Sequence, residues 1–169
     1  MSFNQNIFLI GMMGSWKSTV GKKLSNELDL EFIDTDDEIE DATGESISEI
    51  FSNKGESQFR EMESAFFVEK SKQKGMVIST GGGIVVKEAN RFALQKNGIT
   101  FFLQASPETL SNRIKDTNKR PLLHDEEPIL KLSQIRELRK NFYMDSSHHI
   151  IETDRDNPQQ VTQKILSIL

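Results

Sequence analysis

The stretch Asn6–Thr19, NIFLIGMMGSWKST, decides the fold of this chain. It begins with a short apolar run, Ile7–Ile10, which predicts a strand that is buried on both faces and ends in a tight loop. From Gly11 onward the spacing matches the phosphate-binding loop G-x-x-x-x-G-K-[ST], apart from one residue. Trp16 stands where this pattern has its second glycine.

The loop predicts a polyphosphate site, because backbone N–H groups at the start of a helix point toward an anion and the helix dipole favours negative charge. Lys17 is expected to reach the β- and γ-phosphates, and the Ser18 hydroxyl to bind Mg²⁺. A left-handed backbone at Trp16 costs about 1–2 kcal/mol. We therefore expect weaker nucleotide affinity or poorer phosphate alignment. The nucleotide-binding residues expected in the loop are Gly14, Ser15, Trp16, Lys17, Ser18 and Thr19.

Composition predicts a single domain, 1–169, without disulfides. A chain of this length buries about two-thirds of its unfolded surface in one core. The absence of cysteine excludes thiolate catalysis and cysteine-ligated metals, and it fits a reducing cytoplasm. The polar N-terminus is unlike a signal peptide, and no apolar run approaches the ~20 residues of a membrane span. With 21 basic and 26 acidic residues, the charge of −5 disfavours nucleic acid. We expect a soluble, cytoplasmic protein with neither a membrane nor a nucleic-acid partner.

Beyond the loop, predicted helices alternate with predicted strands. Strands are expected at 7–10, 31–34, 76–79, 99–103 and 148–152, and helices at 17–28, from 35, over 46–73 with a break at Lys54-Gly55, from 106, over 129–142 and after 157. This alternation implies right-handed crossovers and a parallel sheet, with ligands beyond the carboxyl ends of the strands. The predicted fold is a three-layer α/β/α sandwich with a central five-stranded parallel sheet, like the P-loop nucleoside-monophosphate kinases.

Apolar residues at three- to four-residue steps mark the expected buried helix faces. These residues are Val20, Leu24 and Leu28; Phe59, Met62 and Phe66; Ile129, Leu132, Ile135, Leu138 and Phe142; and Val161, Ile165 and Ile168. Residues 115–128 lack such periodicity and carry two prolines among charges, which predicts a mobile loop that could act as a lid.

Five further motifs follow the loop in order. They are Asp34-Thr35-Asp36, Phe59-Arg60-Glu61-Met62-Glu63, Gly81-Gly82-Gly83, Arg120-Pro121-Leu122-Leu123 and Arg139-Lys140-Asn141-Phe142-Tyr143. Each motif alone is weak, but the ordered set is specific. With it the chain resembles the shikimate kinases over almost its whole length.

The resemblance implies ATP-dependent phosphorylation of the 3-hydroxyl of shikimate, on the route to chorismate and the aromatic amino acids. By the pattern of the family, Arg60 and Arg139 bind the substrate carboxylate, a task that suits planar guanidinium groups. Asp36 holds the reacting hydroxyl and accepts its proton, and the Gly81-Gly82 backbone also contacts the substrate. The acceptor-binding helical segment is expected at about 35–62.

On the donor side, the same pattern implies that Asp34 orients Mg²⁺ through water, with Ser18 as the direct ligand. Arg120 is expected to meet the transferring phosphoryl group from the lid, so that Lys17, Asp36 and Arg120 are the catalytic set. Arg113 and Arg155 are expected near the adenine of ATP. The resemblance also suggests a monomer.

Simpler interpretations exist for each motif. Asp34 and Asp36 could only cap a helix, the two arginines could lie on solvated helix faces, and the triple glycine could be a flexible turn. His124, His148 and His149 lack partners at metal-ligand spacing and are interpreted as surface and strand residues.

Two alternative functions and three origins of Trp16 stay open. The chain could be a non-catalytic relative that binds shikimate or an anion, or a different P-loop small-molecule kinase for gluconate or a nucleoside monophosphate. The paired arginines and Asp36 argue against the second alternative. Trp16 could be natural in a chain that no longer turns over ATP, an introduced change such as a fluorescence probe, or a sequence error; it is the only tryptophan.

Overall fold

The computed structural model describes residues 4–114, 121–123 and 127–169. Five strands form one sheet in the order β2-β3-β1-β4-β5, and every neighbouring pair is parallel. The predicted five-stranded parallel sheet is therefore confirmed. The strands are β1 (Asn6–Ile10), β2 (Glu31–Asp34), β3 (Met76–Ser79), β4 (Gly98–Gln104) and β5 (His149–Glu152).

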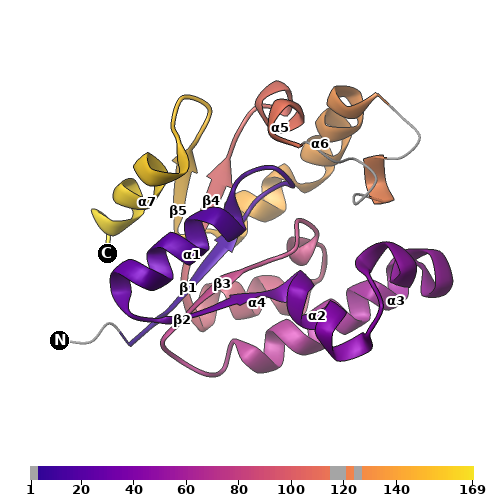
Figure 1. Cartoon of the computed structure of the whole chain (residues 1–169), viewed down its shortest axis with the longest axis horizontal. Coiled ribbons are helices and arrows are strands. Elements are labelled where there is room, and N and C mark those ends of the chain that lie inside the picture. Colours follow the sequence, from indigo (N-terminus) through magenta and orange to yellow (C-terminus); the bar gives the residue numbers. More distant parts are fainter. Residues whose placement is uncertain (1–3, 115–120, 124–126) are drawn as a thin grey trace.

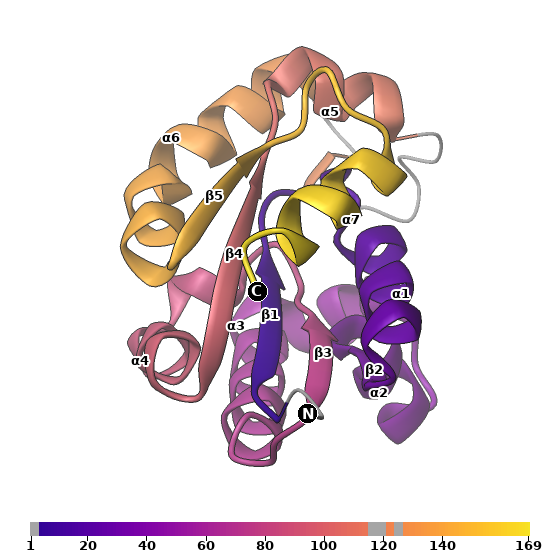
Figure 2. The same ribbon diagram turned by 90° about the vertical axis from the view of Figure 1, so that its left-hand side faces the viewer.

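Helices cover both faces of this sheet, which gives the three predicted layers (Figures 1 and 2). Helices α1 and α7 pack on one face, and α3, α4 and α6 pack on the other. The helices are α1 (Lys17–Leu28), α2 (Thr35–Thr43), α3 (Ile47–Lys70), α4 (Glu88–Lys96), α5 (Pro107–Arg113), α6 (Pro128–Ser146) and α7 (Pro158–Leu166), with 3₁₀ turns η1 (Ile84–Val86) and η3 (Pro121–Leu123).

Strand β1 shows why the sequence gives a sandwich. All five of its residues are buried, and alternate side chains enter opposite layers, as the period of a strand requires. Phe8 and Ile10 join the core under α3, α4 and α6, where Phe8 meets the edge of Phe67. Ile7 and Leu9 join the core under α1 and α7.

A third, smaller core packs α2 against both sides of a break in α3. It consists of Ile39 of α2, Ile50 before the break and Phe59 after it, and it is separate from the two cores of the sheet. Helix α3 breaks at Gly55 (φ 83°, ψ 163°), as predicted, so its first half runs beside α2. In Figure 1 this pair projects beyond the edge of the sheet at which β2 ends.

The predicted buried faces of α6 and α3 are partly wrong. In α6, Leu138 is 78% exposed and Phe142 is 38% exposed, while Leu132, Ile135 and Tyr143 are buried. Arg139 lies in the same row as these buried residues. A prediction that counts only apolar residues therefore places the buried face of α6 at the wrong angle around the helix axis. In α3 the buried row runs through Phe59, Arg60, Glu63 and Phe67, with Met62 and Phe66 only partly buried. Leu28 is also partly buried, and Ile168 is 42% exposed.

The sequence patterns did not predict η1 or α4. The nine residues of α4 begin without a side-chain cap, and its buried face contains Asn90 beside Ala93 and Leu94. The Asn90 amide donates to the Ile84 carbonyl at 2.9 Å and accepts from Ser64 at 2.7 Å. Asn90 is thus a buried polar residue whose amide donor and acceptor are both hydrogen-bonded. Such a residue interrupts the apolar spacing from which a helix is predicted.

Part of the predicted lid is packed. Residues Pro121–Leu123 form η3, whose Leu123 is 3% exposed and joins the core beside α6. Helix α6 begins at Pro128, the last residue of the predicted lid. Arg120 and His124 lie outside the described residues. Along the part of the chain that is described, no helix is sufficiently long and apolar to cross a membrane.

Candidate active site

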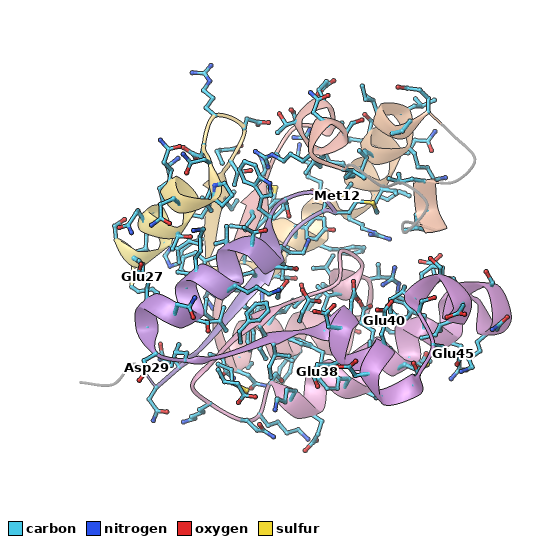
Figure 3. The ribbon with its side chains drawn as sticks, viewed as in Figure 1. Met12, Glu27, Asp29, Glu38, Glu40 and Glu45 are labelled. Atoms are coloured by element: carbon cyan, nitrogen blue, oxygen red, sulfur yellow. The ribbon has the colours of Figure 1, made fainter. Side chains whose placement is uncertain are left out.

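A pocket of about 760 Å³ opens at the carboxyl edge of the sheet, between the loop after β1 and the α2–α3 pair. Figure 3 labels Glu40 of α2, which lines this pocket, and Met12 of the loop after β1, which is buried beneath it. Most of the predicted site residues line it: Gly14, Trp16, Lys17, Ser18, Thr19, Asp34, Asp36, Arg60, Gly81, Gly82 and Arg139. Ser15 is buried within the loop.

The loop after β1 opens α1 as the phosphate-binding pattern requires. Trp16 is the N-cap residue and has a left-handed backbone (φ 69°, ψ 20°), the conformation that glycine adopts at least cost. The Lys17 ammonium donates to the Met12 carbonyl at 2.8 Å and to the Ser15 hydroxyl at 3.4 Å. Lys17 is 8% exposed, so its charge is held close under the loop.

Three oxygen-bearing side chains meet beside the first turn of α1. The Ser18 hydroxyl donates to Asp34 Oδ2 and lies 3.2 Å from the Ser79 hydroxyl. Asp34 Oδ1 accepts from the Asp36 backbone N–H at 3.1 Å and caps α2. Asp34 therefore caps a helix and also presents an oxygen to the pocket, so the two interpretations of this residue are compatible.

The turn after β3 is fixed by neighbouring strands. The Thr80 hydroxyl and N–H both donate to the Leu9 carbonyl, at 2.9 and 3.2 Å. The Gly81 N–H donates to the Thr35 hydroxyl at 3.0 Å. A Cβ at Gly81 would lie only 2.9 Å from Asp36 Oδ1. The glycine thus lets the Asp36 carboxylate lie directly over the turn.

Arg60 enters the pocket as part of a buried ion pair. Its Nη1 donates to Glu63 Oε2 at 2.8 Å, and its Nη2 donates to Glu56 Oε1 at 3.2 Å. Glu63 is fully buried, and burial raises its pKa, although the positive charge of Arg60 opposes this shift. A Cβ on Gly83 would overlap the Arg60 guanidinium group, and one on Gly81 would overlap Glu63 Oε1. The triple glycine is therefore more than a flexible turn.

Arg139 reaches the same turn from α6. Its Nη1 donates to the Gly82 carbonyl at 3.2 Å, and the Tyr143 hydroxyl donates to the same oxygen. Tyr143 is fully buried and stacks on Phe102 with ring centroids 4.9 Å apart. Neither Glu63 nor Tyr143 is among the site residues predicted from the sequence. The sequence signal for each was its place as the last residue of a motif, F-R-x-x-E for Glu63 and R-x-x-x-Y for Tyr143.

The remaining predicted nucleotide contacts lie outside the lining of this pocket. Arg113, at the end of α5, stacks on Trp16, with the guanidinium carbon 3.4 Å from the ring centroid. Arg155 is an exposed residue in the loop between β5 and α7. Among the residues that the structure describes, no cluster of three or more histidine, aspartate or glutamate side chains could hold a metal by itself.

Comparisons with known proteins agree with this geometry. A family model described as shikimate kinase matches residues 13–169. A shikimate kinase of Thermodesulfovibrio yellowstonii is 40% identical over 162 residues, which cover 96% of this chain and 93% of that protein. A solved structure of a shikimate kinase from Acinetobacter baumannii, in complex with shikimate, superposes with a TM-score of 0.94 at 38% identity. That match covers 97% of this chain and 92% of the other.

A more distant structure shares the fold alone. A gluconokinase from Sinorhizobium meliloti superposes with a TM-score of 0.62 at 16% identity, over 99% of this chain and 92% of that one. At this level of identity, the likeness supports the layered architecture and says nothing about the acceptor.

Proposed function

The chain belongs to the shikimate kinase family, and we propose that it transfers the γ-phosphoryl group of ATP to the 3-hydroxyl of shikimate, giving shikimate 3-phosphate and ADP. One observation carries this proposal. A single pocket brings a phosphate-binding loop with Lys17 and Ser18 opposite Asp36 and the arginines Arg60 and Arg139. Donor and acceptor groups therefore face the same space.

Arg60 and Arg139 are suited to bind the carboxylate of the acceptor. Both are planar donors that can make bidentate hydrogen bonds to a carboxylate. Arg60 is held by Glu63 and Glu56, and Arg139 is held by the Gly82 carbonyl, so each guanidinium group is positioned before substrate arrives. Gly81 and Gly82 offer backbone contacts between them.

In the proposed reaction, Asp36 holds the 3-hydroxyl and accepts its proton. The hydroxyl oxygen forms a bond to the γ-phosphorus as the bond from that phosphorus to the β,γ-bridging oxygen breaks, and ADP leaves with the electron pair. Lys17 stabilises the negative charge that develops on the transferred group. We propose the same task for Arg120, which lies outside the described residues. Closure of a lid over about 115–128 would exclude water.

The oxygens beside Lys17 fit Mg²⁺. This ion prefers a few hard oxygen ligands and retains water, so it does not require a cage of side chains. The Ser18 hydroxyl and the Asp34 carboxylate already lie in contact and could hold it directly and through water, respectively. Bound Mg²⁺ would neutralise charge on the β- and γ-phosphates.

The nucleotide is proposed to bind along residues 14–19, with Arg113 and Arg155 on the base side. Trp16 is expected to weaken this part of the site while the acceptor pocket is kept, because the acceptor groups lie on other elements. Trp16 already has the left-handed backbone in this structure, so Trp16→Gly is expected to stabilise the fold by about 1–2 kcal/mol. Removal of the indole from beside the phosphate-binding loop is expected to raise kcat/KM for ATP.

A coupled ADP-release assay tests the function. The chain, Trp16→Gly and Asp36→Asn are each given MgATP with and without shikimate. Turnover is expected only with shikimate, faster for Trp16→Gly, and lower by about 100-fold or more for Asp36→Asn, which cannot act as a base. Shikimate-independent ADP release by both the chain and Trp16→Gly would refute the acceptor. Equal rates for these two proteins would refute the effect of Trp16, and shikimate binding without turnover in either would favour the non-catalytic alternative.

We propose a monomer of one domain that acts in the cytoplasm, where ATP is available, on small-molecule partners alone. The acidic balance of the chain, −5, supports the absence of a nucleic-acid partner. Light scattering coupled to size-exclusion chromatography would test the oligomeric state directly.

A further inference from the structure

The indole of Trp16 is held in a slot beside the phosphate-binding loop. It packs against the core under α1 and α7, and the Arg113 guanidinium carbon lies 3.4 Å from the ring centroid. Arg113 is itself fixed, because its Nη1 donates to the Thr153 hydroxyl at 3.0 Å and its Nη2 donates to the Thr153 carbonyl at 2.6 Å. The aromatic ring thus contacts both an apolar surface and a guanidinium group that is tied to the end of β5.

The direction of a bound nucleotide points to the same slot. Asp36 and the 81–83 turn follow β2 and β3, whereas Arg113 and Thr153 follow β4 and β5. In the strand order β2-β3-β1-β4-β5, the phosphate-binding loop after β1 therefore lies between the acceptor groups and Arg113. The transferred phosphate must lie between the loop and Asp36, so the rest of the donor extends away from the acceptor, past Trp16. A guanidinium plane held at that end offers a base a stacking surface.

We propose that the Trp16 indole occupies the place of the donor's base, so that this chain selects its donor by the polyphosphate and discriminates little among bases. An indole is a planar, fused two-ring system of nearly the size of a purine, and here it already covers the face of Arg113. Because Trp16 is a residue of the chain, its indole occupies the slot at a high effective concentration. This inference rests on the proposed function, because the chain needs a phosphoryl donor only if it transfers a phosphoryl group. Its test measures binding and does not require turnover.

Calorimetric titration compares ATP, GTP, CTP and inorganic tripolyphosphate, each with Mg²⁺, on the chain and on Trp16→Gly. For the chain, the four dissociation constants are expected to agree within about threefold, because the base adds little. For Trp16→Gly, ATP or GTP is expected to bind at least tenfold more tightly than tripolyphosphate. Phe92→Ala removes an aromatic side chain that is 63% exposed on α4, and it is expected to match the unaltered chain.

Several results would overturn the proposal. They are a preference of the unaltered chain for one nucleotide over tripolyphosphate by tenfold or more, failure of the chain to bind tripolyphosphate, or no base preference in Trp16→Gly. Emission of the sole tryptophan gives a second readout. Quenching by nucleotides and not by tripolyphosphate would place the base on the indole and contradict the proposal. Absence of shikimate-dependent ADP release would instead refute the proposed function, and the binding constants would still decide this inference.

Discussion

Two positions of the 81–83 turn require glycine, because the buried ion pair of Arg60 and Glu63 lies against them. A Cβ on Gly83 would overlap the Arg60 guanidinium group, and one on Gly81 would overlap Glu63 Oε1. At Gly82, in contrast, a Cβ would have its nearest neighbour, the Met13 nitrogen, at 3.5 Å, an ordinary contact. Two of the three positions therefore require glycine so that a close approach of Arg60 and Glu63 is possible.

Gly83→Ala is expected to move Arg60 and so to raise the KM for shikimate at least tenfold. It should also lower the free energy of unfolding by about 1–3 kcal/mol, the usual cost of overpacking. Steady-state kinetics and denaturant unfolding measure the two effects. Gly82→Ala is the matched control for stability, since its added methyl group has room. Equal unfolding free energies for the two variants would show that Arg60 and Glu63 move aside for the added methyl group without a loss of stability.

Much of the site could be predicted residue by residue. Lys17, Ser18 and Asp34 follow strands whose carboxyl ends must meet, so their shared pocket follows from the topology. The contact between Trp16 and Arg113 could not be predicted in this way. It depends on how α5 packs beside the loop, and no local pattern records that distance. The position of Glu63 in the site could not be predicted, because a carboxylate on a helix usually faces solvent.

At the scale of elements, one aspartate joins the loop after β5 to the start of α5. Asp154 Oδ1 accepts from the Ser106 N–H and from the Ser106 hydroxyl, both at 2.9 Å. Partial burial alone would raise the pKa of Asp154, but hydrogen bonds from Thr109 and Ser106, with the charge of Arg113, hold it below its ordinary value of 3.8. This loop leads to Arg155, so Asp154 also positions a proposed nucleotide contact.

Asp154→Asn is expected to destabilise the protein in a pH-dependent way. Because the pKa is lower in the folded state, the carboxylate stabilises the fold above the unfolded pKa, and this contribution is lost as the pH falls through the folded pKa. The variant should lose up to about 1 kcal/mol near pH 7, with a difference that shrinks as the pH falls below the ordinary carboxyl pKa of 3.8. Urea unfolding across this range measures it. Ser106→Ala, which removes one of the two donors, should give part of the loss; a difference independent of pH would contradict the assignment.

Apart from α4 and η1, the order and type of the described helices and strands followed from the sequence, but the buried faces of two helices did not. In α6 and α3 the buried rows include Arg139, Arg60 and Glu63, which a pattern of apolar residues assigns to solvent. Helix α4 was missed for a related reason, since Asn90 lies on its buried side. Arg139, Arg60 and Glu63 lie in these rows because the rows form a wall of the site. Asn90 lies on the buried side of α4 because its hydrogen bonds are satisfied there.

At the scale of the whole molecule, α2 and the first half of α3 pack on a small core that is separate from the two cores of the sheet. It contains Ile39 of α2, Ile50 before the break in α3 and Phe59 after it, all fully or nearly buried. Gly55 interrupts the helix that connects them to the sheet. Segments of this kind open at a lower free energy than central strands do. Asp36 and the wall of the pocket formed by residues 46–51 therefore lie on a segment that opens more easily than the central strands, whereas Arg60 and Arg139 lie outside it.

Hydrogen exchange is expected to reveal this difference. Amides of residues 35–54 should exchange at least tenfold faster than those of β1 and β3, because local opening exposes them. Saturating shikimate should slow them selectively, since a ligand stabilises the closed form to which it binds. Mass spectrometry of peptic peptides with and without shikimate makes the comparison, and inorganic sulfate at equal concentration is the control. Uniform protection across the sheet would contradict this view.

The central position of β1 also sets the order in which a newly made chain can mature. Ile7 pairs with Val77 on one side and with Ile99 on the other, so both neighbours of the first strand are translated 70 or more positions later. At roughly 5–20 residues per second, the ribosome works for several seconds before β4 is complete. Until β3 has been made, the apolar segment Ile7–Ile10 has neither of its neighbouring strands, and until β4 follows it has only one. The phosphate-binding loop is thus among the first parts of the chain to be synthesised and among the last to acquire its framework.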